Sequence, residues 1–189
     1  ELPAPVQSNM KLMMERASHM QRLVHNLLDY ARLQPATALS PLNLEALLDD
    51  TLTLVSIPAT FTIHRELGVI TWTTPAAPLQ IALRNLIQNA INHHDRPDGH
   101  ITLRTRQENN TLILEVEDDG PGIPEREHQR IFEMFTRGSQ HGSYEGTGIG
   151  LATVRRVMEL QEGEVSVHST PRRGALFRLR PPSQDKALT

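Results

Sequence analysis

Apolar residues return along the first part of the chain every three or four positions, which is the spacing of a helix in a bundle. The stripe consists of Met10, Met13, Ala17, Met20, Val24, Leu27 and Ala31, and Leu23, Leu28 and Tyr30 widen it. It predicts one helix over residues 1–34, which ends before Pro35 because proline cannot continue the hydrogen-bond ladder. The strict heptad spacing favours packing against another helix over packing on the core of the same domain. His19 and His25 lie off the stripe, so we expect them on the outer face.

Beyond this helix, short runs typical of strands alternate with helical ones. Residues 35–42 predict a linker, and Asn43 predicts the N-cap of a helix that reaches about residue 56. Further helices are predicted over residues 76–94 and 148–161, and strands over 60–66, 69–74, 100–106, 111–118, 164–169 and 175–180. This order predicts an α/β fold: a two-layer sandwich of a mixed sheet and three helices, preceded by one long bundle helix. The sandwich would span residues 43–181, followed by a loose tail over 182–189.

Composition narrows the function classes. At 189 residues the chain fits one domain with a short appendage, and its net charge of −3 argues against a general nucleic-acid-binding protein. It has no cysteine, which excludes disulfides, thiolate catalysis and cysteine zinc sites. No apolar run approaches the roughly 18 residues of a membrane span. Because the chain opens at Glu1 without an initiator methionine, we expect it to be a piece of a longer protein.

Glycines gather in one stretch, since seven of the 11 lie between residues 120 and 150. Two motifs hold five of them: Asp118-Asp119-Gly120-Pro121-Gly122 and Gly146-Thr147-Gly148-Ile149-Gly150-Leu151. The second motif runs into a predicted helix, and backbone N–H groups at a helix start attract anions, so it predicts a phosphate site. No lysine follows a glycine, which excludes a P-loop. A glycine-rich surface loop is the alternative interpretation.

Polar residues beside these motifs point to a nucleotide. Asp118 ends a predicted strand, where it could accept a hydrogen bond from the exocyclic amine of adenine; alternatively, it only starts a turn. Asn85, Asn89 and Asn92–His93 share one face of a predicted helix, although asparagine is a poor helix former. Their amide oxygens suit Mg²⁺, and a solvated polar face is the alternative. The run His93-His94-Asp95 does not predict a metal site, because adjacent helix positions do not converge on one ion.

Four motifs follow one another in a recognisable order. They are Leu83-Arg84-Asn85-Leu86-Ile87-Gln88-Asn89-Ala90, Asp118-Asp119-Gly120-Pro121-Gly122-Ile123, Arg130-Ile131-Phe132-Glu133-Met134-Phe135-Thr136-Arg137 and Gly146-Thr147-Gly148-Ile149-Gly150-Leu151-Ala152. In this order they resemble the N box, first glycine box, F box and second glycine box of bacterial sensor histidine kinases. The resemblance is to the catalytic ATP-binding region, within the superfamily that also holds gyrase, heat-shock-chaperone and mismatch-repair ATPases. Residues 19–32 resemble the second helix of that family's dimerisation and phosphotransfer hairpin.

The resemblance implies roles for the residues at matching positions. Asn89 would coordinate Mg²⁺, and Asp118 would receive the adenine amine. Phe132 and Phe135 would anchor a mobile lid over about residues 123–147, from which Arg137 could reach the phosphates. The other nucleotide-binding positions that it implies are Asn85, Asn92, His93, Gly120, Gly122, Ile123, Gly146, Thr147, Gly148, Ile149, Gly150 and Leu151.

Several positions depart from the family pattern. Asn92 stands where many members have a lysine that contacts phosphate, and His93 stands where tyrosine is frequent. Asn85 replaces the glutamate with which the hydrolases activate water, and this favours a kinase over an ATP hydrolase. Neither His19 nor His25 has the surroundings of the family's phosphoacceptor, whose helix is absent from the chain.

The resemblance therefore implies a protein-histidine kinase that uses ATP and Mg²⁺. It would donate the γ-phosphoryl group to a histidine, for relay to an aspartate in the receiver domain of a response regulator. For the full-length protein it implies a cytoplasmic homodimer, with or without an inner-membrane anchor, and no contact of this segment with membrane or nucleic acid. The alternative is a nucleotide-binding regulatory or interaction module without kinase activity.

Overall fold

The computed structural model describes residues 3–36, 38–136 and 147–182 of the chain. Its helices are α1 (Ala4–Ala31), α2 (Leu44–Thr53), α3 (Ala76–Asn92) and α4 (Gly150–Leu160), and single 3₁₀ turns cover Glu125–Glu127 and Arg130–Phe132. Its strands are β1 (Ser40–Asn43), β2 (Phe61–Leu67), β3 (Thr71–Thr74), β4 (Gly99–Glu108), β5 (Thr111–Asp118), β6 (Glu164–Ser169) and β7 (Ala175–Arg180). Every helix and strand predicted after residue 43 is confirmed to within a few residues.

Five strands form one mixed sheet in the order β2-β4-β5-β7-β6. β2 runs parallel to β4, and the other neighbouring pairs are antiparallel. The β4–β5 hairpin turns at Asn109 and Asn110, whose φ angles of 47° and 60° suit the two-residue turn that matches the twist of the strands. The antiparallel β5–β7 pair places Asp118 directly opposite Ala175, so the last residue of β5 lies beside the first residue of β7.

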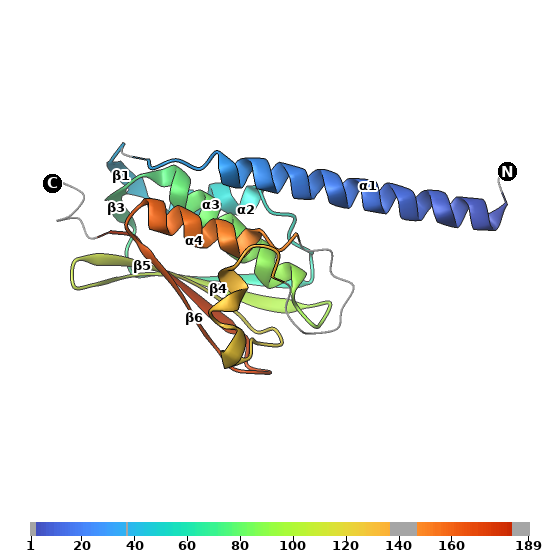
Figure 1. Ribbon diagram of the computed structural model, residues 1–189. Coiled ribbons are helices and arrows are strands. Elements are labelled where there is room, and N and C mark those ends of the chain that lie inside the picture. The colour runs from blue at the N-terminus through green and yellow to red at the C-terminus, as the bar shows by residue number, and fades with distance from the viewer. Residues whose placement is uncertain (1–2, 37, 137–146, 183–189) are drawn as a thin grey trace.

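Helices α2, α3 and α4 lie together on one face of this sheet, which confirms the predicted two-layer sandwich (Figure 1). The core between the layers includes Leu83 and Leu86 of α3 and Phe177 of β7, each at most 1% exposed. The opposite face of the sheet carries paired charges. There the carboxylate of Glu115 accepts hydrogen bonds from Arg106 at 2.7 Å and Arg178 at 2.8 Å, and these bonds outweigh the effect of burial and lower its pKa.

The end of the predicted linker differs from expectation, because residues 40–43 form β1. This strand pairs antiparallel with β3, with Leu42 opposite Trp72. Packing explains the difference: the indole of Trp72 is 4% exposed, and a two-stranded edge tolerates Pro41, which lacks an N–H donor. Asn43 then caps α2 as predicted, since its Oδ1 accepts a hydrogen bond from the Ala46 N–H at 3.0 Å. The folded domain therefore includes β1.

The long helix α1 contacts α4 through a face that differs from the predicted stripe. Half-buried side chains recur at spacings of four and three residues: His19, Leu23, Asn26, Tyr30 and Leu33. Of the predicted stripe, Met13, Met20 and Val24 are 71%, 63% and 54% exposed. The expectation of an outer-face position holds for His25, which is exposed, and is wrong for His19, whose Nδ1 is buried. Leu23 and Tyr30 are among the residues that widen the stripe, but His19 and Asn26 are polar, which is why the apolar pattern alone did not identify this face.

The N-terminal half of α1 extends past the sandwich (Figure 1), and its described side chains before His19 are exposed. Nδ2 of Asn26 donates a hydrogen bond to Oγ1 of Thr147 at 3.0 Å, so the C-terminal half of α1 touches the segment that leads into α4. None of the described helices combines the length and the apolar character that crossing a membrane requires.

Candidate functional site

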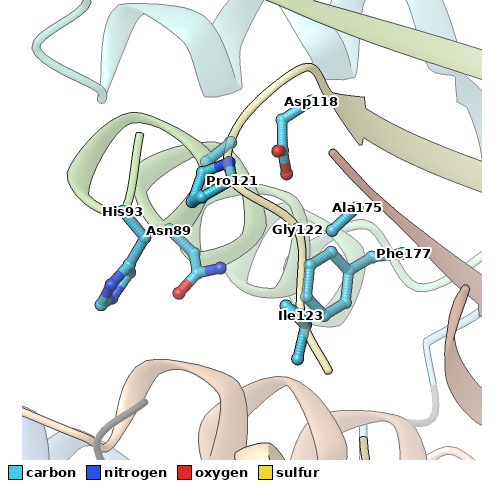
Figure 2. Close-up of a pocket in the computed structure, with 9 residues that line it drawn as sticks. Asn89, His93, Asp118, Pro121, Gly122, Ile123, Ala175 and Phe177 are labelled. Carbon is cyan, nitrogen blue, oxygen red and sulfur yellow. The ribbon is translucent and has the colours of Figure 1, made fainter. Parts of the chain in front are cut away.

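A pocket lies between the C-terminal part of α3 and the loop that follows β5 (Figure 2). Helix α3 contributes one side of it, the loop contributes the other, and β7 contributes two residues beneath them. The residues that line it are Asn89, Ala90, His93, Asp118, Pro121, Gly122, Ile123, Ala175 and Phe177. The fold thus brings together five of the predicted binding residues, from two motifs that lie about 30 positions apart in the sequence: Asn89, His93, Asp118, Gly122 and Ile123.

Asp118 is the acidic group of this pocket. Its Oδ1 accepts a hydrogen bond from the backbone N–H of Gly120 at 3.0 Å. Burial raises the pKa of Asp118 from 3.8 to about 6, and the backbone N–H groups of Gly120 and Ala175 offset only part of this effect. A poorly solvated carboxylate with spare acceptor capacity is stabilised by a ligand that donates a hydrogen bond. Asp118 is therefore suited to bind a neutral N–H donor such as an aromatic amine.

Glycines shape the loop that carries Asp118. Gly122 has a φ of 72°, and a Cβ at this position would stand 2.1 Å from the carbonyl oxygen of Thr170. Gly174, in the turn between β6 and β7, also has a φ of 72°, and its Cβ would stand 1.8 Å from the carbonyl oxygen of Asp118. The N–H of Gly174 donates to the carbonyl of Gly120 at 3.0 Å. The first glycine motif is thus pressed against the β6–β7 turn, which fixes the position of Asp118.

The three asparagines that share a face of α3 have different surroundings. Asn89 lines the pocket, where its amide group is available to a ligand (Figure 2). Asn85 donates from Nδ2 to the carbonyl of Ile81 at 2.8 Å, and its Oδ1 lies beside Gly150 at the start of α4. Asn92 is exposed and accepts a hydrogen bond from a glutamine one turn earlier. One asparagine therefore reaches the pocket, a second faces the predicted phosphate site, and the third faces solvent.

His93 ends α3 at the rim of the pocket. Its side chain is exposed on one side, while the surrounding protein atoms lower its pKa from the usual 6.5 by desolvation. The neutral ring is the form that can both donate and accept a hydrogen bond. His93 lines the pocket together with Asn89, and its contact with a nucleotide stays a prediction.

Helix α4 begins inside the second glycine motif, at Gly150, without a side-chain cap. Ile149 occupies the N-cap position and is fully buried, and the first turn carries no acidic residue. The first backbone N–H groups of α4 thus have no capping side chain among the described residues, which suits a helix start that binds an anion. Gly148 has a φ of 68°, and a Cβ there would lie 2.9 Å from Cα of Phe135. Leu151, in contrast, packs against the hydrophobic core.

The two phenylalanines of the predicted lid anchor differ in burial. Phe132 is 9% exposed and meets Phe177 edge to face, with ring centroids 6.3 Å apart. Phe135 is 55% exposed and has a φ of 63°, which is unusual for a bulky residue. Its N–H donates to the carbonyl of Gly148 at 2.8 Å, so it ties the middle of the predicted lid to the second glycine motif. Arg137 and Gly146, with the other lid residues from 137 to 146, lie outside the described residues.

Sequence reasoning missed the contributions of β7 and α1. Ala175 and Phe177 line the pocket because β7 pairs with β5, opposite Asp118 and Val116. The alternation of apolar and polar residues predicted both strands but contains no signal for which strands pair. Thr147 of the second glycine motif is hydrogen-bonded by α1, and no local pattern indicated that contact.

Comparison with known proteins places these features in a family. Residues 74–185 match the family model described as histidine kinase-, DNA gyrase B- and HSP90-like ATPase. The sensor protein KdpD of Escherichia coli (strain K12) is 32% identical over 170 residues, which cover 86% of this chain and 19% of KdpD. The chain therefore spans about a fifth of the length of that relative.

Solved structures agree. The mycobacterial sensor histidine kinase MprB superposes with a TM-score of 0.68 at 25% identity, over 76% of this chain and 98% of that chain. Full-length ShkA in complex with AMPPNP superposes with a TM-score of 0.76 at 26% identity, over 97% of this chain and 40% of that chain. Because the family model covers more than half of the chain, this chain belongs to the family of histidine kinase-, DNA gyrase B- and HSP90-like ATPases, and its sandwich is the catalytic ATP-binding domain of that family, similar to the domain of sensor histidine kinases.

Proposed function

We propose that ATP binds in the pocket of Figure 2 with the exocyclic amine of adenine donating to Asp118. The observation that carries this proposal is the half-buried carboxylate of Asp118 in the pocket lining, which has acceptor capacity to spare and whose pKa is raised by burial. The nonpolar surroundings from Ile123, Ala175 and Phe177 suit the flat faces of a base, and the glycine backbone allows close approach. His93 at the rim would contact the base or the ribose.

Asn89 would hold Mg²⁺ on the side of the pocket that faces the phosphates. The residue fits the ion, because a neutral amide oxygen is a hard ligand and Mg²⁺ usually takes few ligands from the protein and more from phosphate and water. When bound, the ion would neutralise charge on the phosphate oxygens. The chain's own part is to hold that amide in place through the buried turns of α3 on either side of it.

The triphosphate would extend from this pocket towards the uncapped start of α4. Its backbone N–H groups, together with the positive end of the helix dipole, favour an anion without a lysine. Asn85 faces the same helix start from α3 and could donate or accept there. Contacts of Arg137 and Gly146 with the phosphates remain predictions from the family resemblance.

The reaction would transfer the γ-phosphoryl group to a histidine of another segment of the protein. A ring nitrogen attacks phosphorus, the bond from the γ-phosphorus to the bridging oxygen breaks, ADP leaves, and the imidazole loses its N–H proton to solvent. Since phosphoryl transfer depends chiefly on positioning and charge neutralisation, the pocket and the α4 start would supply most of the protein's contribution. Relay to a response-regulator aspartate and homodimerisation through α1 complete the proposal.

Calorimetric titration of the chain with ATP, with and without Mg²⁺, tests the binding step. We expect saturable binding that Asp118→Ala weakens by about tenfold or more and that Asp50→Asn, a change at an exposed aspartate of α2, leaves unchanged. Incubation with γ-labelled ATP tests the transfer step. We expect no acid-labile, base-stable label on this chain alone, and such label on a longer protein that includes the acceptor helix. Absence of ATP binding by the unaltered chain, or equal binding by the Asp118→Ala variant, contradicts the proposal.

A further inference from the structure

Asp119, the neighbour of the proposed adenine acceptor, sits in a dense set of hydrogen bonds. Its Oδ1 accepts from Nε2 of His94 at 3.0 Å and from the backbone N–H of His100 at 2.7 Å. Its Oδ2 accepts from the guanidinium of Arg96 at 2.7 Å and lies 3.2 Å from Nδ1 of His100. Burial alone would raise the pKa of Asp119, but these hydrogen bonds outweigh it and hold the pKa well below its usual range. The Asp119 carboxylate is therefore a fixed negative charge at the start of the glycine loop.

His94 is the buried partner in this set. The residue is 2% exposed, and its ring meets Phe61 edge to face at a centroid distance of 5.2 Å. Two glycines leave room for it: a Cβ on Gly99 would stand 2.8 Å from its Nε2, and a Cβ on Gly120 would stand 3.4 Å from its Cδ2. An imidazole enclosed in this way has little freedom to choose another partner.

The hydrogen-bond geometry places a proton on Nε2 of His94, because the ionised Asp119 carboxylate beside it can only accept. Nδ1 lies 3.3 Å from the backbone N–H and 3.2 Å from the carbonyl oxygen of Arg96, so the chain holds this side of the ring whether Nδ1 accepts or donates. Nε2 then donates to Asp119. The ring of His94 is thus held on one side by the backbone of Arg96 and on the other by the carboxylate of Asp119.

The hydrogen bond between His94 and Asp119 joins the two walls of the proposed adenine pocket. His94 follows His93 at the end of α3, the element that carries Asn89, and Asp119 follows Asp118 at the end of β5. Between these two walls lies the space that the base would occupy. A shift of Asp119 would turn the Asp118 carboxylate, because the two residues share a peptide bond.

We propose that His94 is a positioning residue that acts through Asp119 to aim the Asp118 carboxylate at the amine of adenine. The inference rests on the proposed function, since it assumes that ATP binds with its amine on Asp118. It assigns a role to two residues outside the pocket lining, and it concerns the base-specific part of the affinity rather than the phosphate part.

Comparison of two nucleotides separates the base-specific part of the affinity from the phosphate part. Purine riboside triphosphate matches ATP except that it lacks the exocyclic amine, so the ratio of its Kd to that of ATP measures the contribution of the amine. For the unaltered chain we expect a ratio of about ten, which is the fold-change that about 1.4 kcal/mol produces. In His94→Leu, which keeps a similar volume and removes the donor, we expect the ratio to approach one. His94→Gln, whose amide can donate from a position near that of Nε2, should restore much of the ratio.

Further variants complete the test. Asp119→Asn probes the same contact from the other side if His94→Leu does not fold, and it should also lower the ratio. His25→Leu is the matched control, since this histidine of α1 is exposed, and it should leave the ratio unchanged. A loss of folded protein alone would lower the fraction that binds and would not alter the ratio among folded molecules.

The outcomes keep the two proposals apart. If the unaltered chain fails to bind ATP, or binds both nucleotides equally, the proposed function itself is wrong about the site or about Asp118. If the unaltered chain prefers ATP and both His94→Leu and Asp119→Asn keep the full preference, the function stands and the positioning role of His94 is refuted.

Discussion

Replacing Asp118 by asparagine should make the protein more stable and a poorer ATP binder. The asparagine side chain has the shape of the protonated carboxyl, which is the form that the pocket favours, since burial raises the pKa of Asp118 from 3.8 to about 6. A shift of this size means that the charged form costs the folded state about 3 kcal/mol. Because the amide offers one acceptor to the two backbone N–H groups that face Asp118, we expect a net gain nearer to about 2 kcal/mol at pH 8.

The gain in unfolding free energy from Asp118→Asn must increase as the pH rises. Folding raises the pKa of Asp118, so the folded protein binds this proton more tightly than the unfolded chain does. The stability that the proton contributes is fully present below a pH of about 3.8 and is lost as the pH rises through about 6. The difference in unfolding free energy between Asp118→Asn and the unaltered chain should therefore be near zero at pH 4 and largest above pH 7.

Urea unfolding of both proteins over a series of pH values between about 4 and 8 measures this difference. Asp119→Asn is the internal control with the opposite sign: hydrogen bonds outweigh burial and lower the pKa of Asp119, so its replacement should destabilise the protein at neutral pH, by less as the pH falls. If Asp118→Asn is no more stable than the unaltered chain at pH 8, or if its advantage is the same at pH 4, then burial of the Asp118 charge does not have the effect argued here.

Three further predictions concern the rest of the site. Asn89→Ala should abolish the Mg²⁺-dependent tightening of ATP binding in calorimetry while circular dichroism shows an unchanged fold; a retained Mg²⁺ effect would remove Asn89 from the metal site. GTP should bind more weakly than ATP by about 1–3 kcal/mol in a competition assay, because guanine presents a carbonyl oxygen where adenine has its amine, and equal affinity would contradict the orientation on Asp118. Gly148→Ala should lower the unfolding free energy by about 1–3 kcal/mol, since its φ is 68° and its Cβ would press on Phe135. Thermal denaturation measures this loss, and Gly150→Ala, inside α4, should lower the unfolding free energy by less in the same experiment.

The secondary structure could be predicted well because local chemistry determines most of it. The cap at Asn43 and the left-handed turn at Asn109 and Asn110 are cases in which a single residue type satisfies a local backbone requirement. β1 is the exception. Its four residues show no alternation of apolar and polar side chains. They form a strand only because they pair with β3, where the side chain of Trp72 is buried.

The site was predictable where a residue's role follows from its own motif. Asn89 belongs to the N box, Asp118 opens the first glycine box, and both line one pocket. Asn85 and Asn92 have the same residue type on the same helix face, but one bonds back to its own helix and the other reaches solvent. Which of three asparagines faces a pocket is decided by what packs against α3, and the helix period alone does not contain that information.

Contacts between distant segments were the hardest part of the site to predict. His94 and Asp119 lie 25 residues apart, and the sequence places His94 in a run of polar residues that resembles an exposed helix end. Burial of a histidine at that point requires glycines at positions 99 and 120, which are individually unremarkable in the sequence. The contact between His94 and Asp119 can be recognised only from the folded structure, in which β4 pairs with β5 and their ends lie next to α3.

Helix α1 shows how one helix can present two faces with the same spacing. The contact face at positions 19, 23, 26, 30 and 33 and the methionine stripe both repeat every three or four residues. The apolar stripe gave the stronger sequence signal, yet the sandwich binds the mixed face, through contacts such as the hydrogen bond from Asn26 to Thr147. The contact with the sandwich and the predicted packing of the heptad stripe against another helix use different side chains. Packing of the stripe against another helix, as its heptad spacing predicts, is therefore compatible with α1 staying in place beside α4. Movement of such a helix would be transmitted through Thr147 to the segment that we propose binds phosphate.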